Sequence, residues 1–219
     1  MKNILIIAGP SAVGKTTVAH RMLDLEPRFE FVRSVTTRPR RADQFDNEYI
    51  YITEDEFKHL IETQGVLEHT CYAGNYYGTP RSEIDRITSE GNIPLLILDI
   101  NGVESLSKNK GDIVPCGVYV YDDIAVMSDR LFERYKDALD DPENQRRLDS
   151  RREQNRKDYS EMPDHEPYFY SFIRNCSSVD SCAEKVCKVF ADFCAGTPKN
   201  DEEVKALAAR LKASVEGQM

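Results

Sequence analysis

A glycine-rich turn near the start of the chain restricts its fold more than any other feature. Residues 6–17, IIAGPSAVGKTT, contain the spacing G-x-x-x-x-G-K-[ST] after an apolar run and before an amphipathic segment. This pattern predicts a buried strand, a phosphate-binding loop and a helix, in that order. An ordinary strand-to-helix turn would require neither Lys15 nor Thr16 at these positions, so we expect a nucleoside triphosphate site.

The residue types in this loop explain how it would hold a phosphate. Glycine adopts backbone conformations that other residues avoid, so consecutive N–H groups can converge on phosphate oxygens at the start of a helix. The Lys15 ammonium adds a positive charge for the β and γ phosphates, and the Thr16 hydroxyl can bind Mg²⁺. The residues that we expect to contact ATP are Gly9, Ser11, Ala12, Val13, Gly14, Lys15, Thr16 and Thr17.

Length and composition exclude several classes of protein. The chain has 219 residues, 40% of them hydrophobic, which suffices for one core with a small inserted subdomain. No segment resembles a membrane span or a signal peptide. A net charge of −9 argues against nonspecific binding to nucleic acid, and six cysteines without a C-x-x-C pair are typical of thiols in a reducing compartment. We therefore expect a cytoplasmic protein with no membrane and no nucleic-acid partner.

Strand-like and helical segments alternate along the chain, which favours an α/β fold. Residues 4–8, 93–99 and 116–121 are apolar runs typical of buried strands in a parallel sheet. Residues 33–80 instead suggest a small β-rich insertion around one helical segment. Residues 128–160 are dense in charge and predict a mobile, mostly helical hairpin.

The predicted architecture is a P-loop NTPase-type parallel sheet with flanking helices, a β-rich insertion and a helical lid. We expect one domain over residues 1–195, with a core of 1–32, 81–127 and 161–195, the insertion at 33–80 and the lid at 128–160. We expect residues 196–219 to form a helical tail. Its apolar face should dock on the domain or on a second copy, and consists of Val204, Leu207, Ala208, Leu211 and Val215.

A basic cluster, RSVTTRPRR at residues 33–41, opens the insertion. Alone it could be a nucleic-acid or nuclear-localisation patch, or a solvated loop with incidental arginines. The acidic chain disfavours the first interpretation. Tyrosines and a glutamate follow in EYIYIT, VLEH and GNYYGT. Arginines together with tyrosine hydroxyls suit a second phosphate, which disfavours a solvated loop with incidental arginines.

These motifs resemble the guanylate kinases, the P-loop enzymes that transfer the γ phosphate of ATP to GMP. GPSAVGKTT, SVTTRPRR, LEH and GNYYGT follow the order of that family, and the resemblance covers about residues 3–193. It implies that ATP and GMP are the substrates. A carboxylate can accept both adjacent N–H donors of guanine, whereas adenine presents an acceptor there. By resemblance, Arg38, Arg41, Tyr49 and Tyr77 hold the phosphate of GMP, and Ser34, Glu68, Thr79 and Asn101 contact the base.

The same resemblance assigns the catalytic groups. Because the attacking phosphate oxygen is already ionised, catalysis requires positioning and charge neutralisation rather than a general base. Lys15 and lid arginines would supply the charge, with Mg²⁺ bound near Thr16 and Asp99. The expected lid arginines are Arg130, Arg134 and Arg147, with Arg146 as the alternative to Arg147, whereas Arg151, Arg152 and Arg156 are assigned to surface ion pairs.

One departure and two alternatives remain open at this stage. The family often has Asp-Ile-Asp where this chain has Asp99-Ile100-Asn101, so Asn101 keeps one acceptor and base specificity could soften. The chain could instead be a catalytically inactive guanylate kinase-like scaffold, although such scaffolds usually lack an intact phosphate loop. It could also be a sugar-phosphate kinase of the same fold, which has no evident need for Glu68. We expect a monomer or a homodimer.

Overall fold

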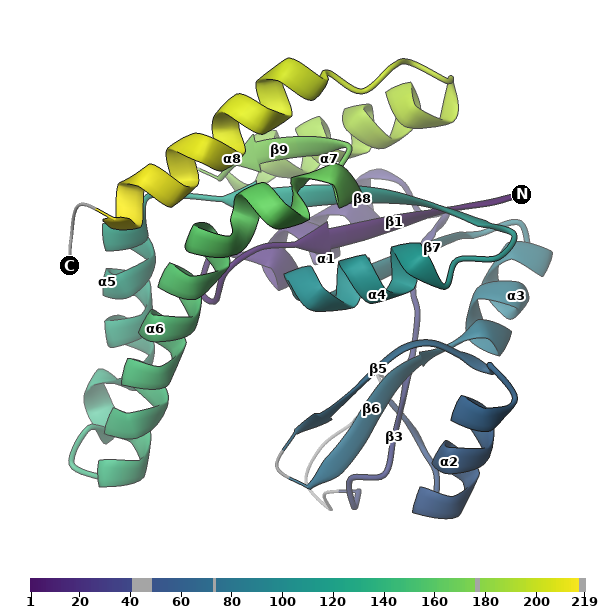
Figure 1. The fold of residues 1–219 in the computed structure, drawn as a ribbon, viewed down its shortest axis with the longest axis horizontal. Helices are drawn as coiled ribbons and strands as arrows, with labels where there is room; N and C mark the ends of the chain where they lie inside the picture. The colour runs from purple at the N-terminus through teal and green to yellow at the C-terminus, as the bar shows by residue number, and fades with distance from the viewer. Residues whose placement is uncertain (41–48, 73, 176–177, 217–219) are drawn as a thin grey trace.

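The computed structural model describes residues 1–40, 49–72, 74–175 and 178–216, and a five-stranded parallel sheet forms its centre (Figure 1). The strand order is β2-β7-β1-β8-β9, and every neighbouring pair is parallel. The strands are β1 (Lys2–Ala8), β2 (Phe29–Phe31), β7 (Ile93–Ile97), β8 (Ile113–Tyr121) and β9 (Ser171–Arg174). The expected fold class is therefore confirmed, because the three apolar runs form the three central strands.

The sequence prediction differs from the sheet in detail. The short edge strand β2 was not expected. The run at 93–99 was expected to be a strand throughout, but β7 ends at Ile97. Asp99 is extended and caps the next helix, α4 (Ile100–Lys108), by accepting a hydrogen bond from the Gly102 N–H at 2.7 Å. Capping satisfies a helix N–H that has no partner within the helix, which explains why the strand stops here.

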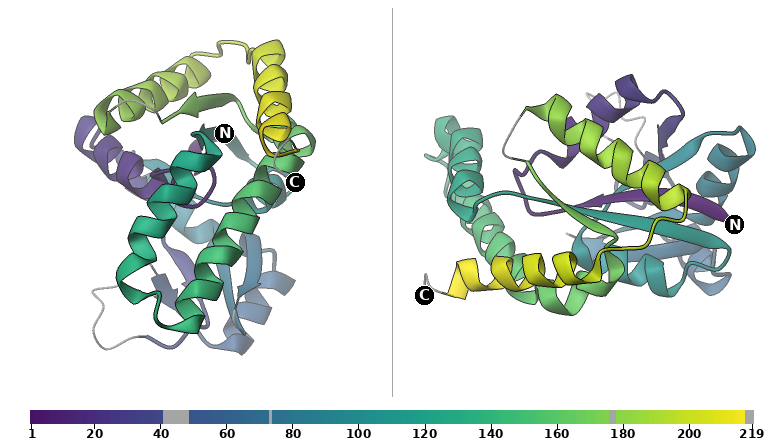
Figure 2. Two further views of the ribbon diagram at one scale, coloured as in Figure 1. Left: turned by 90° about the vertical axis from the view of Figure 1, so that its left-hand side faces the viewer. Right: turned by 90° about the horizontal axis from the view of Figure 1, so that it is seen from above.

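Helices cover both faces of this sheet (Figure 2). On one face, α1 (Lys15–Leu25) packs beside α7 (Val179–Cys194), and α4 lies on the other face together with part of α6 (Pro142–His165). Residues 4–8 of β1 are completely buried between these layers. The core is thus centred on the strand that leads directly into the glycine-rich loop.

A second, four-stranded sheet lies beneath the first in Figure 1, with the order β4-β3-β6-β5. Its strands are β3 (Ser34–Thr36), β4 (Tyr49–Tyr51), β5 (Val66–Tyr72) and β6 (Asn75–Pro80), with α2 (Glu54–Glu62) against it and α3 (Arg81–Ser89) after it. The β3–β4 pair is parallel, and the other two pairs are antiparallel. Phe57 of α2 stacks on the ring of Tyr76 at 5.2 Å, which fixes the helix on this sheet.

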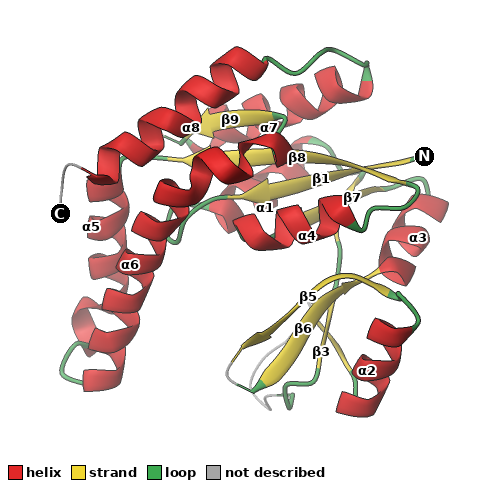
Figure 3. Ribbon diagram, viewed as in Figure 1, coloured by secondary structure: helices red, strands yellow, loops and turns green. Residues whose placement is uncertain are grey.

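A helical hairpin projects beside the small sheet (Figure 3). It consists of α5 (Ile124–Tyr135), the short helix η1 (Lys136–Ala138) and α6, and a second short helix, η2 (Glu166–Tyr168), follows it. The Asp141 carboxylate caps α6 by accepting from the Glu143 N–H at 2.8 Å, and Pro142 occupies the first turn. The hairpin helices begin before residue 128 and end after residue 160, so the lid boundaries expected from charge lie within helices.

The last helix, α8 (Asp201–Glu216), lies across α6. Val204, Ala208, Leu211 and Val215 are buried within this single chain, and Leu207 is half-buried. The apolar face of the tail therefore docks on its own domain. None of the described helices is long and apolar enough to cross a membrane.

Candidate functional site

The loop between β1 and α1 has the backbone conformation that its glycines predict. Gly9 has φ +152° and Gly14 has φ +98°, and a Cβ at Gly9 would lie 2.1 Å from the Val120 carbonyl oxygen. Ala12 also lies in the left-handed region, with φ +64°. This conformation costs a residue other than glycine about 1 to 2 kcal/mol. Side-chain contacts must therefore hold the loop in this shape.

Lys15 supplies the first of these contacts. Its Nζ donates hydrogen bonds to the carbonyl oxygens of Gly9 (2.6 Å) and Pro10 (2.9 Å). An ammonium has three donors, so this geometry leaves one for a phosphate oxygen. Burial lowers the pKa of Lys15 to about 8, and the negative charge of Asp158 opposes this shift.

Two buried asparagines hold the loop from outside. Asn175, after β9, donates from Nδ2 to the Val13 carbonyl oxygen at 2.7 Å. Asn155, on α6, accepts at Oδ1 from the Ser11 N–H at 2.7 Å and donates from Nδ2 to the Ser11 carbonyl oxygen at 3.1 Å. Asn155 was not identified from the sequence.

Arg151 lies at the same loop, contrary to its expected role as a surface ion-pair partner. Its Nη1 donates to the Ser11 hydroxyl oxygen at 3.3 Å, and its charge contributes to lowering the pKa of Lys15. Arg147, the expected catalytic residue, lies one turn further out on α6 and pairs there with the exposed Glu143. Four residues of helix span about 6 Å, so Arg147 lies about that much further along α6 than Arg151. Of these two arginines, Arg151 is the one that contacts the loop.

The remaining arginines of the hairpin differ in their surroundings. Arg130 pairs with the buried Asp122 at 3.1 Å, at the end of β8. Arg134 is close enough to Lys15 to lower its pKa. Arg146 donates to the Pro142 carbonyl oxygen at 3.3 Å, and Arg156 pairs with Glu153 at 3.8 Å, both on exposed parts of α6. The positive charge near the loop thus comes from both helices of the hairpin.

Apart from the phosphate loop, a hollow of about 400 Å³ lies between the two sheets. Its lining includes the predicted residues Ser34, Tyr49, Glu68, Tyr77, Asp99 and Asn101. These side chains come from all four strands of the small sheet and from the start of α4. An adjoining hollow of about 600 Å³ is lined by Ser34, Tyr49 and Thr79 together with Thr16 of the phosphate loop. The two predicted sites are therefore neighbours.

Glu68 is a half-buried acidic group of this hollow. The Thr79 hydroxyl donates to its Oε1 at 2.6 Å, which orients the carboxylate. Burial raises the pKa of Glu68, and the negative charge of Asp99 raises it further. A single oriented carboxylate in such surroundings is a strong acceptor for a ligand that brings its own N–H donors. Asn101 lies at the same hollow and is exposed.

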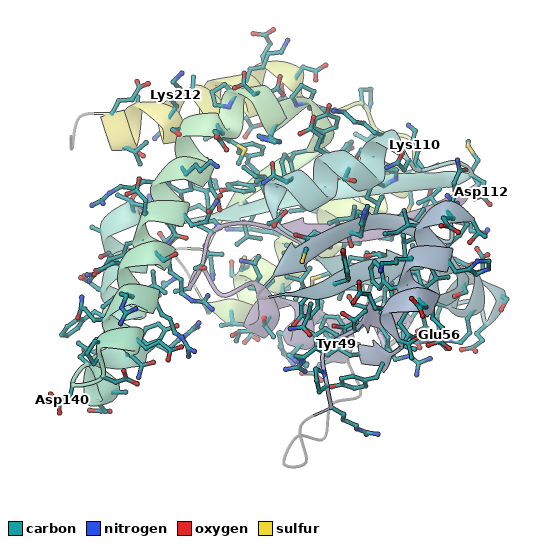
Figure 4. The ribbon with its side chains drawn as sticks, turned by 60° about the horizontal axis from the view of Figure 1, so that its bottom comes forward. Tyr49, Glu56, Lys110, Asp112, Asp140 and Lys212 are labelled. Atoms are coloured by element: carbon teal, nitrogen blue, oxygen red, sulfur yellow. The ribbon has the colours of Figure 1, made fainter. Side chains whose placement is uncertain are left out.

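Aromatic residues and an arginine lie together on the small sheet. The Arg38 guanidinium lies 5.2 Å from the centre of the Tyr49 ring and donates to the Tyr51 hydroxyl at 3.2 Å. The rings of Tyr49 and Tyr77 meet edge to face at 6.0 Å. In the view of Figure 4, Tyr49 lies between the tip of the hairpin and α2. Arg41 lies outside the described residues, so its predicted role is not addressed by this geometry.

Thr16 and Asp99 are the predicted metal ligands. The described residues contain no group of three His, Cys, Asp or Glu side chains that could hold a metal ion alone. Thr16 follows β1 and Asp99 follows the neighbouring strand β7, so a hydroxyl and a carboxylate lie at the same edge of the sheet. Mg²⁺ favours few protein oxygens and keeps waters and substrate phosphates as its other ligands. This donor set fits Mg²⁺ bound together with a triphosphate.

Sequence comparisons with known proteins show the family of the chain. A family model described as guanylate kinase matches residues 1–192. A guanylate kinase of Lactobacillus johnsonii is 34% identical over 140 residues, which cover 62% of this chain and 67% of that protein. A guanylate kinase of Lactococcus lactis is 33% identical over 141 residues, with coverage of 63% and 67%. The crystal structure of guanylate kinase from Anaplasma phagocytophilum has a similar fold, with a TM-score of 0.59, 20% identity and coverage of 91% of this chain and 88% of that one.

Proposed function

Because the chain belongs to the guanylate kinase family, we propose that it transfers the γ phosphate of ATP to GMP and releases ADP and GDP. The arrangement of two adjoining hollows carries this proposal. One reaches Thr16 of the phosphate loop, and the other contains the oriented Glu68 carboxylate. A phosphate donor and a guanine base can then bind side by side in one molecule.

The base of GMP is recognised at Glu68 in this proposal. Guanine presents N1–H and N2–H₂ to the two carboxylate oxygens, and Ser34 and Thr79 orient the carboxylate and the base edge. Adenine would place a lone pair against Glu68, so the half-buried carboxylate would gain no donor from the base and would keep only that of Thr79. Arg38, Tyr49, Tyr77 and the predicted Arg41 bind the phosphate of GMP, because guanidinium and phenol groups donate to its oxygens.

Transfer itself relies on positioning and charge. Two anions must approach in line, so the barrier is lowered by cations that neutralise the phosphates. The remaining donor and the charge of Lys15 serve the β and γ phosphates, and Arg130 and Arg134 approach from α5. In place of Arg147, we assign the α6 contribution to Arg151, because its guanidinium already contacts Ser11.

Mg²⁺ belongs to the same proposal, with Thr16 and Asp99 as its protein-side partners. When bound, it supplies further neutralisation of phosphate charge. The substrates are intracellular nucleotides, so a cytoplasmic location and a role in purine nucleotide metabolism follow from the proposed reaction. ATP, GMP and Mg²⁺ are the only ligands that the proposal needs, without nucleic acid or membrane, and a monomer or homodimer would serve.

An ADP-release assay across a panel of nucleoside monophosphates tests the proposal. The purified chain with Mg²⁺ and ATP should release ADP with GMP far faster than with AMP, CMP or UMP. Size-exclusion chromatography with light scattering gives the oligomeric state of the same sample. Binding of ATP without ADP release in the presence of any acceptor would favour the inactive scaffold. ADP release with sugar phosphates but not with GMP would favour a sugar-phosphate kinase.

A further inference from the structure

We propose that Asn155 is a positioning residue that fixes α6 to the phosphate loop and thereby sets Arg151 over the γ phosphate. This inference rests on the proposed function, since it assigns Asn155 an effect on phosphoryl transfer. Asn155 is only 1% exposed, and its amide contacts both polar main-chain groups of Ser11. A buried amide with a donor and an acceptor engaged on one residue has a single favourable orientation.

The helical repeat explains how this contact controls Arg151. Residues three or four apart lie on the same face of a helix, so Arg151, Asn155 and Asp158 share the face toward the loop. Asn155 contacts the Ser11 main chain, and Arg151 contacts the Ser11 hydroxyl one turn away. A helix that slips by one residue turns by about 100°, which would carry Arg151 away from Ser11. The two hydrogen bonds of Asn155 oppose this slip.

The contact also stabilises the loop. Ser11 precedes Ala12, which has φ +64°, so the main-chain groups of Ser11 are held next to the strained residue. The C-terminal half of α6 also contacts α8 through Tyr159, which shares a hollow with Leu211. Both α8 and the loop therefore contact α6, whereas Glu143 and Arg147 near its start are exposed. Asn155 lies where the fixed part of α6 meets the nucleotide site.

A double-mutant cycle with Arg151→Ala tests the proposal in the full chain. We expect Asn155→Ala to lower kcat by about 10- to 100-fold, the range for a displaced catalytic group, and to change the KM for GMP by less than about twofold. In the Arg151→Ala background, the same change should slow kcat by no more than about twofold. The matched control is Lys157→Ala, an exposed change two residues away on α6, which should leave kcat unchanged.

Hydrogen–deuterium exchange of the loop gives a readout that is independent of the acceptor substrate. Asn155→Ala should speed exchange of the Ser11 N–H, and Lys157→Ala should not. If Asn155→Ala fails to fold, the near-isosteric Asn155→Asp serves, because it loses the donor to the Ser11 carbonyl oxygen and should also slow kcat.

Three results would overturn the inference: an unchanged kcat in a folded variant, effects of Asn155→Ala and Arg151→Ala that multiply independently, or unaltered exchange at Ser11. Failure of the proposed function would look different, because the wild-type chain itself would release no ADP with GMP while exchange at Ser11 still depended on Asn155.

Discussion

The pH of the medium should control ATP affinity through Lys15. Burial lowers the pKa of its ammonium to about 8, from an ordinary value of 10.5. A bound triphosphate brings several negative charges to this group and raises the pKa again, so the protonated form is the one that binds ATP. Affinity is therefore greatest below pH 8 and falls as the pH rises through 8.

The magnitude follows from the fraction of protein that carries the charge. With a pKa of about 8, Lys15 is protonated in about nine tenths of the molecules at pH 7 and in about one tenth at pH 9. The apparent Kd for ATP should then rise about tenfold over this range, or about 1.4 kcal/mol. The last phosphate proton of ATP has a pKa of about 6, so the charge of ATP itself changes little.

Isothermal titration calorimetry at pH 7, 8 and 9 measures this dependence. At pH 8, ATP binding should take up about half a proton, which titrations in buffers with different ionisation enthalpies reveal. Lys15→Met is the control, and it should bind ATP more weakly with a Kd that does not vary over this range. A constant wild-type Kd would show that Lys15 remains charged, and an equal slope in Lys15→Met would assign the titration to another group.

Four substitutions test the remaining assignments. Glu68→Gln turns one acceptor into a donor that faces the donors of guanine, so kcat/KM for GMP should fall about 10- to 100-fold. The same assay with AMP shows how far the preference for GMP over AMP falls. Asn101→Asp should lower the KM for GMP more than that for IMP, because only GMP has the 2-amino group; an equal gain would exclude this contact. Arg38→Ala should raise the KM for GMP much more than that for ATP, and equal effects would place its ligand elsewhere. Arg151→Ala should lower kcat at least tenfold more than Arg147→Ala, and the reverse order would restore Arg147 as the catalytic residue.

The phosphate loop could be predicted from sequence because its function depends on consecutive residues. The strand, the glycines and Lys15 follow one another in the chain. Gly9 and Gly14 have positive φ angles, which glycine adopts without strain. The base side was predicted by resemblance, and Ser34, Glu68 and Asn101 line one hollow, whereas Thr79 lines the adjoining one. The hydrogen bond from Thr79 to Glu68 could not be derived, since it depends on the register of β5 and β6, which is irregular between Val66 and His69.

Arg151 was misassigned because α6 carries many arginines at similar spacings. Charge alone does not show which of them faces the core, and an arginine on a polar helix most often belongs to a surface ion pair. A signal was nevertheless present. Leu148, Tyr159 and Met162 are buried on α6, and their spacing of eleven and three residues marks its inward face. Arg151 and Arg152 lie three and four residues after Leu148, so this signal brings both arginines near that face without choosing between them.

The contacts of the two asparagines show why the shape of the loop is not a purely local property. Asn155 and Asn175 lie 144 and 162 residues from the loop residues that they bind, so no short sequence window contains both partners. The left-handed Ala12 lies between those partners, Ser11 and Val13. Each hydrogen bond contributes about 1 kcal/mol, which together is enough to offset the cost of one left-handed residue. The strained loop can then persist before any phosphate binds, because α6 and the segment after β9 hold it on both sides of the strain.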